Sequence, residues 1–243
     1  PGIARRHVAD ETESAATMGA EAARRALESA QVKPGDISII ALTTTTPDYC
    51  NYPSTACLVQ KALGCRPAAA FDLSAACSGF VYGLEMVKSY LLCHPGHKAL
   101  VIGSEVLSRH VDWADRSSAM LFGDGAAAVV LETVDCPTPH LSASLLGADG
   151  GGSDLIAREG GARKPLSANL LQETVTRMDV PYLQMDGHAV YAFAVRKLSE
   201  VVTALCNQAP TSLESLDLII PHQANYRILE AVARRMSVPL ENF

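Results

Sequence analysis

The sequence lacks the features of a membrane-spanning, exported or disulfide-bonded protein. No apolar run reaches the roughly 18 residues that a membrane-spanning helix needs, and the first residues, PGIARRHVADETE, are polar and charged, unlike a secretion signal. The seven cysteines are an odd number and contain no C-x-x-C pair, which argues against a disulfide framework or a structural zinc. We therefore expect a soluble, cytoplasmic protein with no membrane partner.

Excess positive charge and low-complexity segments are missing as well. The formal net charge is −6, so the overall charge does not attract nucleic acid, and an acidic partner would have to meet a local basic patch. With 48% hydrophobic and 19% charged residues over 243 positions, the chain can bury a large core. A folded protein of one large domain or two smaller ones is expected.

Two distant stretches show the same order of patterns. Residues 12–30 carry a helical apolar stripe, and after a turn ISIIALT (37–43) is typical of a strand. Residues 188–206 predict a second helix, and after a loop LDLII (216–220) predicts a second buried strand. The repetition predicts an α/β fold of two related halves.

The break between the halves is predicted where two prolines interrupt the pattern, in ETVDCPTPH. This gives an N-terminal half at 1–134 and a C-terminal half at 135–243. Within the second half, the glycine-rich segment 157–174 is interpreted as a surface excursion over the core.

Cys77 lies where a short apolar run gives way to a helical stripe. Phe80, Leu84, Val87 and Leu91 recur at helical spacing, so Cys77 is expected at a strand-to-helix junction. A helix N-terminus presents unpaired N–H groups and partial positive charge, which favour a thiolate and a developing oxyanion. Cys77 is a candidate nucleophile, and the alternative is a buried, unreactive cysteine among small residues.

His222 is a candidate partner for Cys77. It follows the predicted strand 216–220 and precedes a new helical stripe. Equivalent junctions of two related halves would face each other, and this would bring a nucleophile and its partner together. Taken alone, His222 also fits an ordinary histidine at the end of a strand.

Three other motifs predict no ligand site. FGDGAAAVV contains G-x-G-x-x-A, but Gly125 leads into a strand-like segment, whereas a dinucleotide fingerprint opens a helix. GADGGGS (147–153) is interpreted as a surface loop instead of a phosphate cradle. In CHPGH (93–97) the cysteine and histidine side chains could bind a metal, but Pro95-Gly96 prevents a helix from holding them on one face, so no metal is expected.

At these residues the chain resembles the ketoacyl synthase III family of condensing enzymes, within the thiolase-like superfamily. The segments that carry the resemblance are TPDYCNYPSTAC, FDLSAACSGFVYGL, LFGDGAAAVVLE, the MDG at 185–187 and IIPHQANYRI. The resemblance implies a layered α-β-α-β-α core of two pseudo-symmetric halves, a homodimer, and no cofactor besides the substrate acyl-CoA.

The resemblance also implies a reaction. Cys77 would take an acyl group from acyl-CoA, and a decarboxylative Claisen condensation with malonyl-acyl carrier protein would give 3-oxoacyl-acyl carrier protein and start fatty acid synthesis. His222 would donate from Nε2 to the thioester oxygen. Arg116 would contact coenzyme A and Tyr52 would cap the acyl pocket. The surface for acyl carrier protein would comprise Gln223, Ala224, Asn225, Tyr226, Arg227 and Arg234, although Arg234 also fits a solvated helix position.

The chain departs from the family in one respect. The family uses an asparagine in a Gly-Asn-Thr or Gly-Asn-Ser segment, which this chain does not contain, and Asn225 belongs to the HQAN motif. Because the chain ends at Phe243, before that segment, a truncated chain is expected. The alternatives are a polyketide-type starter enzyme, a non-catalytic fragment that binds carrier protein, and a Cys-His hydrolase.

Overall fold

The computed structural model describes residues 2–50, 52–136, 141–158, 182–209 and 211–243. A four-stranded sheet in the N-terminal half has the strand order β2-β1-β3-β4. The central strand β1 pairs in parallel with β2 and β3, whereas β4 is antiparallel to β3. The strands are β1 (Ile37–Thr43), β2 (Ala69–Leu73), β3 (Lys98–Val106) and β4 (Asp124–Glu132). The predicted strand at 37–43 is confirmed.

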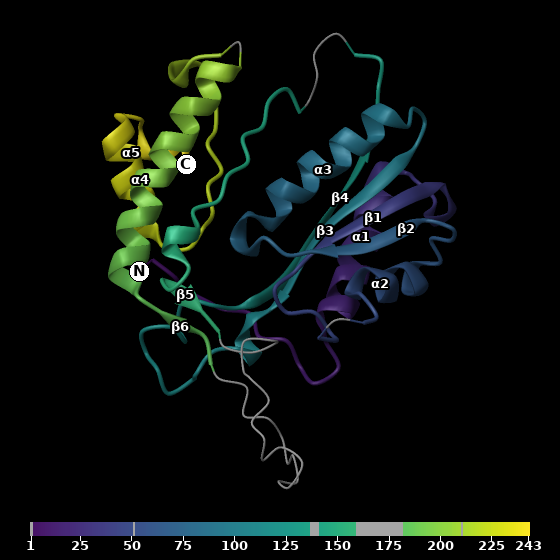
Figure 1. Cartoon of the computed structure of the whole chain (residues 1–243), viewed down its shortest axis with the longest axis horizontal. Coiled ribbons are helices and arrows are strands. Elements are labelled where there is room, and N and C mark those ends of the chain that lie inside the picture. Colours follow the sequence, from purple (N-terminus) through teal and green to yellow (C-terminus); the bar gives the residue numbers. More distant parts are fainter. Residues whose placement is uncertain (1, 51, 137–140, 159–181, 210) are drawn as a thin grey trace, which may run out of the picture.

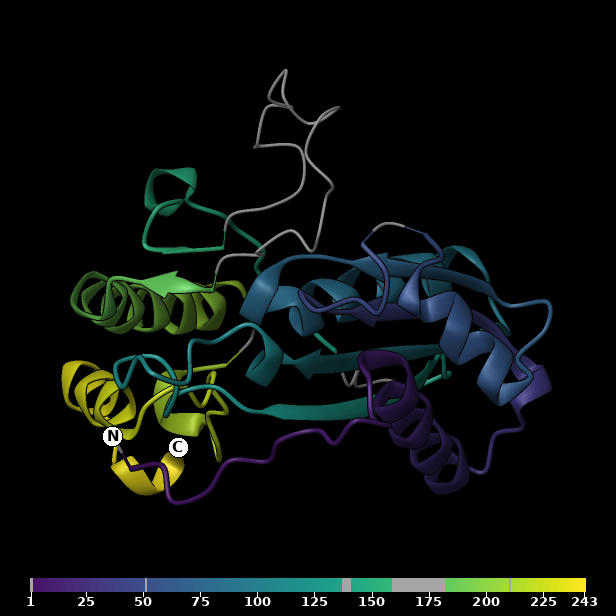
Figure 2. The same ribbon diagram turned by 90° about the horizontal axis from the view of Figure 1, so that it is seen from below.

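Helices cover both faces of this sheet (Figures 1 and 2). Along β1 and β3 successive side chains alternate, so Ile40 and Leu42 pack toward α1 and α2, while Ile39 and Ala41 pack toward α3. Burial on both faces explains the largely apolar sequence of β1, ISIIALT. The helices are α1 (Ala15–Ala30), α2 (Thr55–Leu63) and α3 (Gly79–Cys93).

The C-terminal half supplies two helices that pack against each other at one end of the molecule (Figure 1). These are α4 (Gly187–Gln208) and α5 (Tyr226–Met236), and they confirm the helices predicted from apolar spacing. A small antiparallel pair, β5 (Ile156–Ala157) and β6 (Gln184–Met185), precedes α4. The short 3₁₀ turns are η1 (Pro34–Asp36), η2 (Ala76–Ser78), η3 (Leu107–Arg109), η4 (Gly150–Gly152), η7 (Leu213–Ser215) and η8 (Leu240–Asn242).

The predicted strand at 216–220 is wrong. The segment follows η7 just as β1 follows η1, but no strand of the described residues lies beside it. The Ile219 N–H donates to the Asn242 carbonyl at 2.7 Å, and Leu218 and Ile220 are 56% and 80% exposed. Apolar alternation alone does not make a strand, because the ladder needs a hydrogen-bonding neighbour.

Most of the predicted excursion at 157–174 lies outside the described residues, and the division into halves at 134 and 135 stays a prediction. Gly125 lies in β4, so the glycine motif opens a strand and not a helix, as expected. None of the helices in the described ranges is both long enough and apolar enough to cross a membrane.

Candidate active site

Cys77 lies in η2, between the end of β2 and the start of α3, as the sequence predicts. The residue is exposed to solvent. Ala76, just before it, has a φ of 45°. This left-handed conformation costs a residue with a Cβ about 1–2 kcal/mol. Strain of this kind persists where the surrounding fold imposes it, and it clusters at functional sites.

Two glycines hold the beginning of α3 directly on the sheet. A Cβ at Gly79 would lie 3.1 Å from the Cβ of Thr43, and one at Gly83 would lie 3.1 Å from methyl groups of Thr43 and Val101. Side chains at these positions would push the helix away. The close packing therefore fixes where α3 starts and, through it, where Cys77 lies.

The surroundings of Cys77 favour its neutral thiol form. Although Cys77 has exposed surface, loss of water around its sulfur raises the pKa of the thiol, and the carboxylate of Glu105 raises it further, outweighing the lowering by a backbone hydrogen bond. These effects oppose the helix N-terminus, which was expected to favour the thiolate. Desolvation and a negative neighbour both disfavour the charged form.

The Glu105 carboxylate is held by a turn of threonines, a feature that the sequence analysis missed. Its oxygens accept hydrogen bonds from the Thr45 N–H at 2.8 Å, the Thr45 hydroxyl at 3.0 Å, and the Thr46 hydroxyl at 2.6 Å. The Thr44 hydroxyl lies at 3.4 Å, and the Thr46 hydroxyl accepts from the Val106 N–H at 2.8 Å. The signal was the run of four threonines at 43–46, since buried hydroxyls need partners.

His222 lies in the segment between η7 and α5, and it is exposed. Loss of water lowers the pKa of its imidazole, so the neutral form is favoured. Asn225 caps α5, because its side-chain oxygen accepts a hydrogen bond from the Arg227 N–H at 3.0 Å. This role agrees with leaving Asn225 out of the catalytic set.

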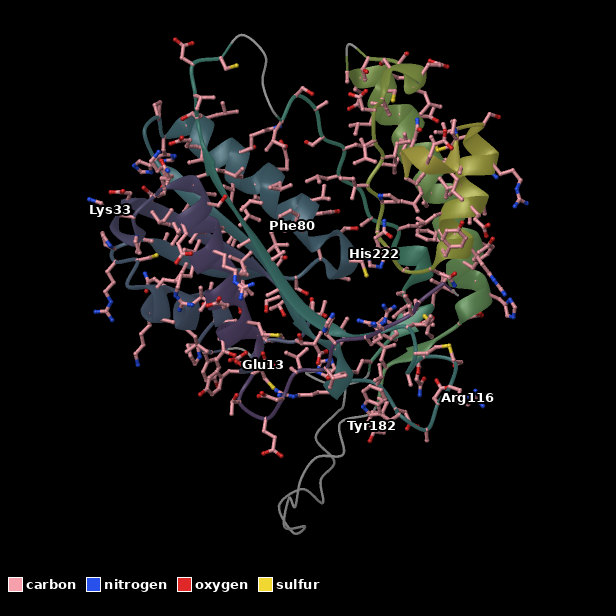
Figure 3. All side chains as sticks on the ribbon, turned by 180° about the vertical axis from the view of Figure 1, so that it is seen from behind. Glu13, Lys33, Phe80, Arg116, Tyr182 and His222 are labelled. Carbon is pink, nitrogen blue, oxygen red and sulfur yellow. The ribbon has the colours of Figure 1, made fainter. Side chains whose placement is uncertain are left out.

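Figure 3 shows His222 between the α4–α5 pair and the beginning of α3, where Phe80 is labelled. Phe80 lies in the first turn of α3, three residues after Cys77. No hydrogen bond joins Cys77 to His222 among the described side chains. The convergence of the sulfur and the imidazole in one chamber stays a prediction.

The residues expected to meet acyl carrier protein lie together at the start of α5 and along it. Arg227 and Arg234 are exposed on this helix, and neither forms an ion pair with another described residue. An open pocket lies at its N-terminal end, lined by residues 2–6 and by Gln223, Asn225, Tyr226 and Leu229. The residues predicted to bind acyl carrier protein are Gln223, Ala224, Asn225, Tyr226, Arg227 and Arg234.

The remaining predicted residues lie on other loops. Arg116 is exposed in a turn. In the same turn the Asp115 carboxylate accepts hydrogen bonds from the hydroxyls of Ser118 and Ser117. These bonds lower the pKa of Asp115. Tyr52 is 85% exposed, between β1 and α2.

The CHPGH segment begins at Cys93, the last residue of α3, and its histidines lie against Tyr90. His94 stacks on Tyr90 with ring centroids 4.1 Å apart, and His97 Nδ1 is 3.0 Å from the Tyr90 hydroxyl. Among the described residues no group of three or more histidine, cysteine or acidic side chains could hold a metal ion.

Comparisons with known proteins agree on one family. The model of the family 3-oxoacyl-[acyl-carrier-protein (ACP)] synthase III matches residues 71–150. Beta-ketoacyl-[acyl-carrier-protein] synthase III of Erythrobacter litoralis is 43% identical over 242 residues, which is 99% of this chain and 71% of the relative.

Solved structures show the same similarity over nearly the whole chain. The crystal structure of 3-oxoacyl-[acyl-carrier-protein] synthase III from Aquifex aeolicus has a TM-score of 0.86 at 37% identity, covering 99% of this chain and 71% of that one. The priming beta-ketosynthase of the R1128 polyketide biosynthetic pathway has a TM-score of 0.84 at 32% identity, covering 98% and 68%. The predicted thiolase-like α/β class is confirmed.

Proposed function

The chain belongs to the beta-ketoacyl-[acyl-carrier-protein] synthase III family, and we propose that Cys77 and His222 perform the chemistry of this family. The family's enzymes condense an acyl-CoA primer with malonyl-acyl carrier protein and so initiate fatty acid synthesis. The observation that carries the proposal is the 43% identity along 99% of the chain. A second observation supports the proposal: Cys77 is exposed and follows the strained residue Ala76 at a strand-to-helix junction.

In the first step the Cys77 sulfur attacks the thioester carbonyl of acyl-CoA. A new carbon–sulfur bond forms, the bond to the coenzyme A sulfur breaks, and the proton of the resting thiol ends on the departing coenzyme A thiolate. A thiol is both a good nucleophile and a good leaving group, so the acyl group waits on Cys77 while the second substrate enters. Because the primer arrives as an activated thioester, the reaction needs no cofactor.

In the second step malonyl thioester loses carbon dioxide and becomes an enolate. His222, whose neutral form is favoured because loss of water around the imidazole lowers its pKa, donates a hydrogen bond from Nε2 to the enolate oxygen. The enolate carbon attacks the acyl carbonyl, the bond to the Cys77 sulfur breaks, and the sulfur takes up a proton. The product is 3-oxoacyl-acyl carrier protein.

The exposed residues serve the two substrates. The positive charges of Arg227 and Arg234, with Gln223, Ala224, Asn225 and Tyr226, attract the acidic carrier protein by salt-sensitive steering. Arg116 pairs with phosphate or stacks on adenine of coenzyme A, as a planar guanidinium can. In a homodimer Tyr52, which is 85% exposed, reaches the partner's acyl pocket.

The test is acylation of the intact protein with labelled acyl-CoA, followed by peptide mapping. Label is expected on Cys77 and is lost in Cys77→Ser. The control Cys57→Ser, which removes another exposed cysteine, keeps the label. Label on a different residue would refute the assignment. His222→Gln is expected to retain acylation but to lose release of carbon dioxide from malonyl-acyl carrier protein.

A second candidate is a priming enzyme of polyketide synthesis, because one such ketosynthase is 32% identical with a TM-score of 0.84. It would acylate Cys77 too. Competition between acyl-CoA primers, with identification of the 3-oxoacyl product, separates the two. A Cys-His hydrolase is disfavoured, since no described carboxylate bonds to His222 to orient it, and it would release free fatty acid instead.

A further inference from the structure

We propose that the N-terminal strap, defined as residues 2–9, forms one side of the surface for acyl carrier protein and adds Arg5 to the basic side chains that bind this acidic partner. The inference rests on the proposed function for the identity of the partner. It brings a segment from the opposite end of the chain to a surface that the sequence motif places only at 223–227 and at Arg234.

The strap begins against the first residue of α5. Gly2 has a φ of 85°, and a Cβ at this position would overlap the Cβ of Tyr226. Only glycine allows so close an approach, and the left-handed φ favours glycine as well. Figure 2 shows the strap running from the side of α5 to α1. Segments from the two ends of the chain therefore meet at Tyr226.

The other end of the strap is fixed just before and at the start of β4. The Arg6 guanidinium donates to the Leu121 carbonyl at 2.6 Å, and the Asp124 N–H donates to the His7 carbonyl at 2.9 Å. The Ala9 N–H in turn donates to the Asp124 carboxylate at 2.7 Å. Because both ends of the strap are held, the residues between them have a defined place beside α5.

The strap and the start of α5 enclose the open pocket described above. Arg5 and Arg6 line it together with Gln223, Asn225 and Tyr226, and none of its lining residues is acidic. Its volume of about 280 Å³ lies below the roughly 300–1,000 Å³ of small-molecule sites, but it can admit one or two side chains. The size and charge of the pocket therefore favour an acidic side chain of a partner protein.

Arg5 is available to pair with such a side chain. It is exposed, and it forms no ion pair or side-chain hydrogen bond with another residue of the described ranges. The neighbouring helix α5 carries Arg227, Arg234 and Arg235 against one acidic residue, Glu230. A chain with a net charge of −6 thus gathers positive charge at this end, where it would attract an acidic carrier protein.

The test is binding of fluorescently labelled acyl carrier protein to the full chain, measured by anisotropy at several salt concentrations. Arg5→Ala is expected to weaken binding by about 1.5- to fivefold, the range for one exposed ion pair, and to reduce the salt dependence. Arg5→Glu should weaken binding further, and Arg5→Lys should retain most of it. Lys33→Ala, which removes one positive charge far from α5, is the control and should bind like the wild type (Figure 3).

A second pair of variants tests the placement of the strap. Gly2→Ala puts a Cβ into Tyr226, whereas Gly96, with a similar φ of 86°, has no neighbouring atom within 4 Å of an added Cβ. Gly96→Ala therefore shares the backbone strain without the contact. Gly2→Ala should weaken binding at least as much as Arg5→Ala, because it displaces the whole strap, and Gly96→Ala should not weaken it.

The form of the carrier protein identifies the contact. The apo form lacks the phosphopantetheine arm and its phosphate, and its binding should depend on Arg5 as strongly as that of the holo form. A dependence confined to the holo form would assign Arg5 to the phosphate and overturn the choice of acidic side chains.

Binding is measured apart from catalysis, so two failures can be told apart. An Arg5→Glu protein that binds like the wild type would overturn the proposal, as would a Gly2→Ala protein that binds as well as Gly96→Ala, or a wild type that does not bind. If these results accompany acylation of Cys77, the strap assignment fails alone. If Cys77 takes up no label while Arg5→Glu weakens binding, the proposed function fails and the role of the strap stands.

Discussion

Replacing Gly83 with valine is expected to destabilise the protein and to disturb the start of α3. The helix lies so close to the sheet at this point that an added Cβ would be 3.1 Å from a methyl group of Thr43 and 3.1 Å from one of Val101. Both neighbours belong to strands whose backbones are fixed on two sides by β-pairing. The helix must therefore move, and Cys77 precedes its first turn.

The size of the effect follows from two opposing contributions. Overpacking a well-filled interior costs about 1–3 kcal/mol. Valine is a slightly better helix residue than glycine, which returns about 0.4 kcal/mol. The free energy of unfolding is therefore expected to fall by about 0.6–2.6 kcal/mol in Gly83→Val. For Gly83→Ala, the gain in helix propensity of about 1 kcal/mol offsets the milder contact, so the change should stay within about 1 kcal/mol of zero.

The assay is urea unfolding of the full chain followed by circular dichroism, together with the rate at which acyl-CoA labels Cys77. Met86→Val is the matched control, because Met86 lies on the same helix and is 47% exposed. Met86→Val should lower the free energy of unfolding by less than about 0.5 kcal/mol and leave the rate of Cys77 labelling unchanged. A Gly83→Val protein as stable as the wild type, or a control that loses as much, would show that the tight contact does not govern the packing of α3.

Three further changes test other parts of the fold. Loss of water around the imidazoles lowers the folded-state pKa of both His222 and His110, so the unfolded chain binds more protons. Stability that is fully present above about pH 6.5 therefore falls as the pH is lowered. In urea unfolding, His222→Gln should weaken this pH dependence. Asp72→Asn should lower the free energy of unfolding by about 1–2 kcal/mol in the same assay, because the carboxylate accepts two hydrogen bonds of 2.7 Å from N–H groups at the start of α2. Leu100→Ala, at a fully buried site, should lower the free energy of unfolding by about 2.7–5 kcal/mol in the same assay.

The elements that local sequence specifies were predicted well. The strand at 37–43 is an apolar, β-branched run that is buried on both faces, and the helix at 188–206 has apolar spacing that a strand could not use. The junction at Cys77 was predicted from the change from a strand-like apolar run to apolar residues at helical spacing. In each case the signal and the structure lie in the same stretch of chain.

The segment at 216–220 shows where local reasoning fails. Its sequence alternates and is apolar, as in β1, yet Leu218 and Ile220 are exposed and no described strand bonds to it. Whether such a run becomes a strand depends on hydrogen bonds supplied by a distant segment, which the run itself does not encode.

The protonation of Cys77 depends on tertiary structure in the same way. The partial positive charge at a helix N-terminus stabilises a nearby thiolate by about 0.3–1 kcal/mol at an exposed site, and this effect is confined to the first turn of the helix. Loss of water around the sulfur and the charge of Glu105 act in the opposite direction, and the fold brings them together by pairing three strands in parallel. The motif around Cys77 therefore predicts which sulfur accepts the acyl group. Loss of water around that sulfur, and after it the carboxylate of Glu105 on another strand, raise the pKa of the thiol, and neither can be read from the motif itself.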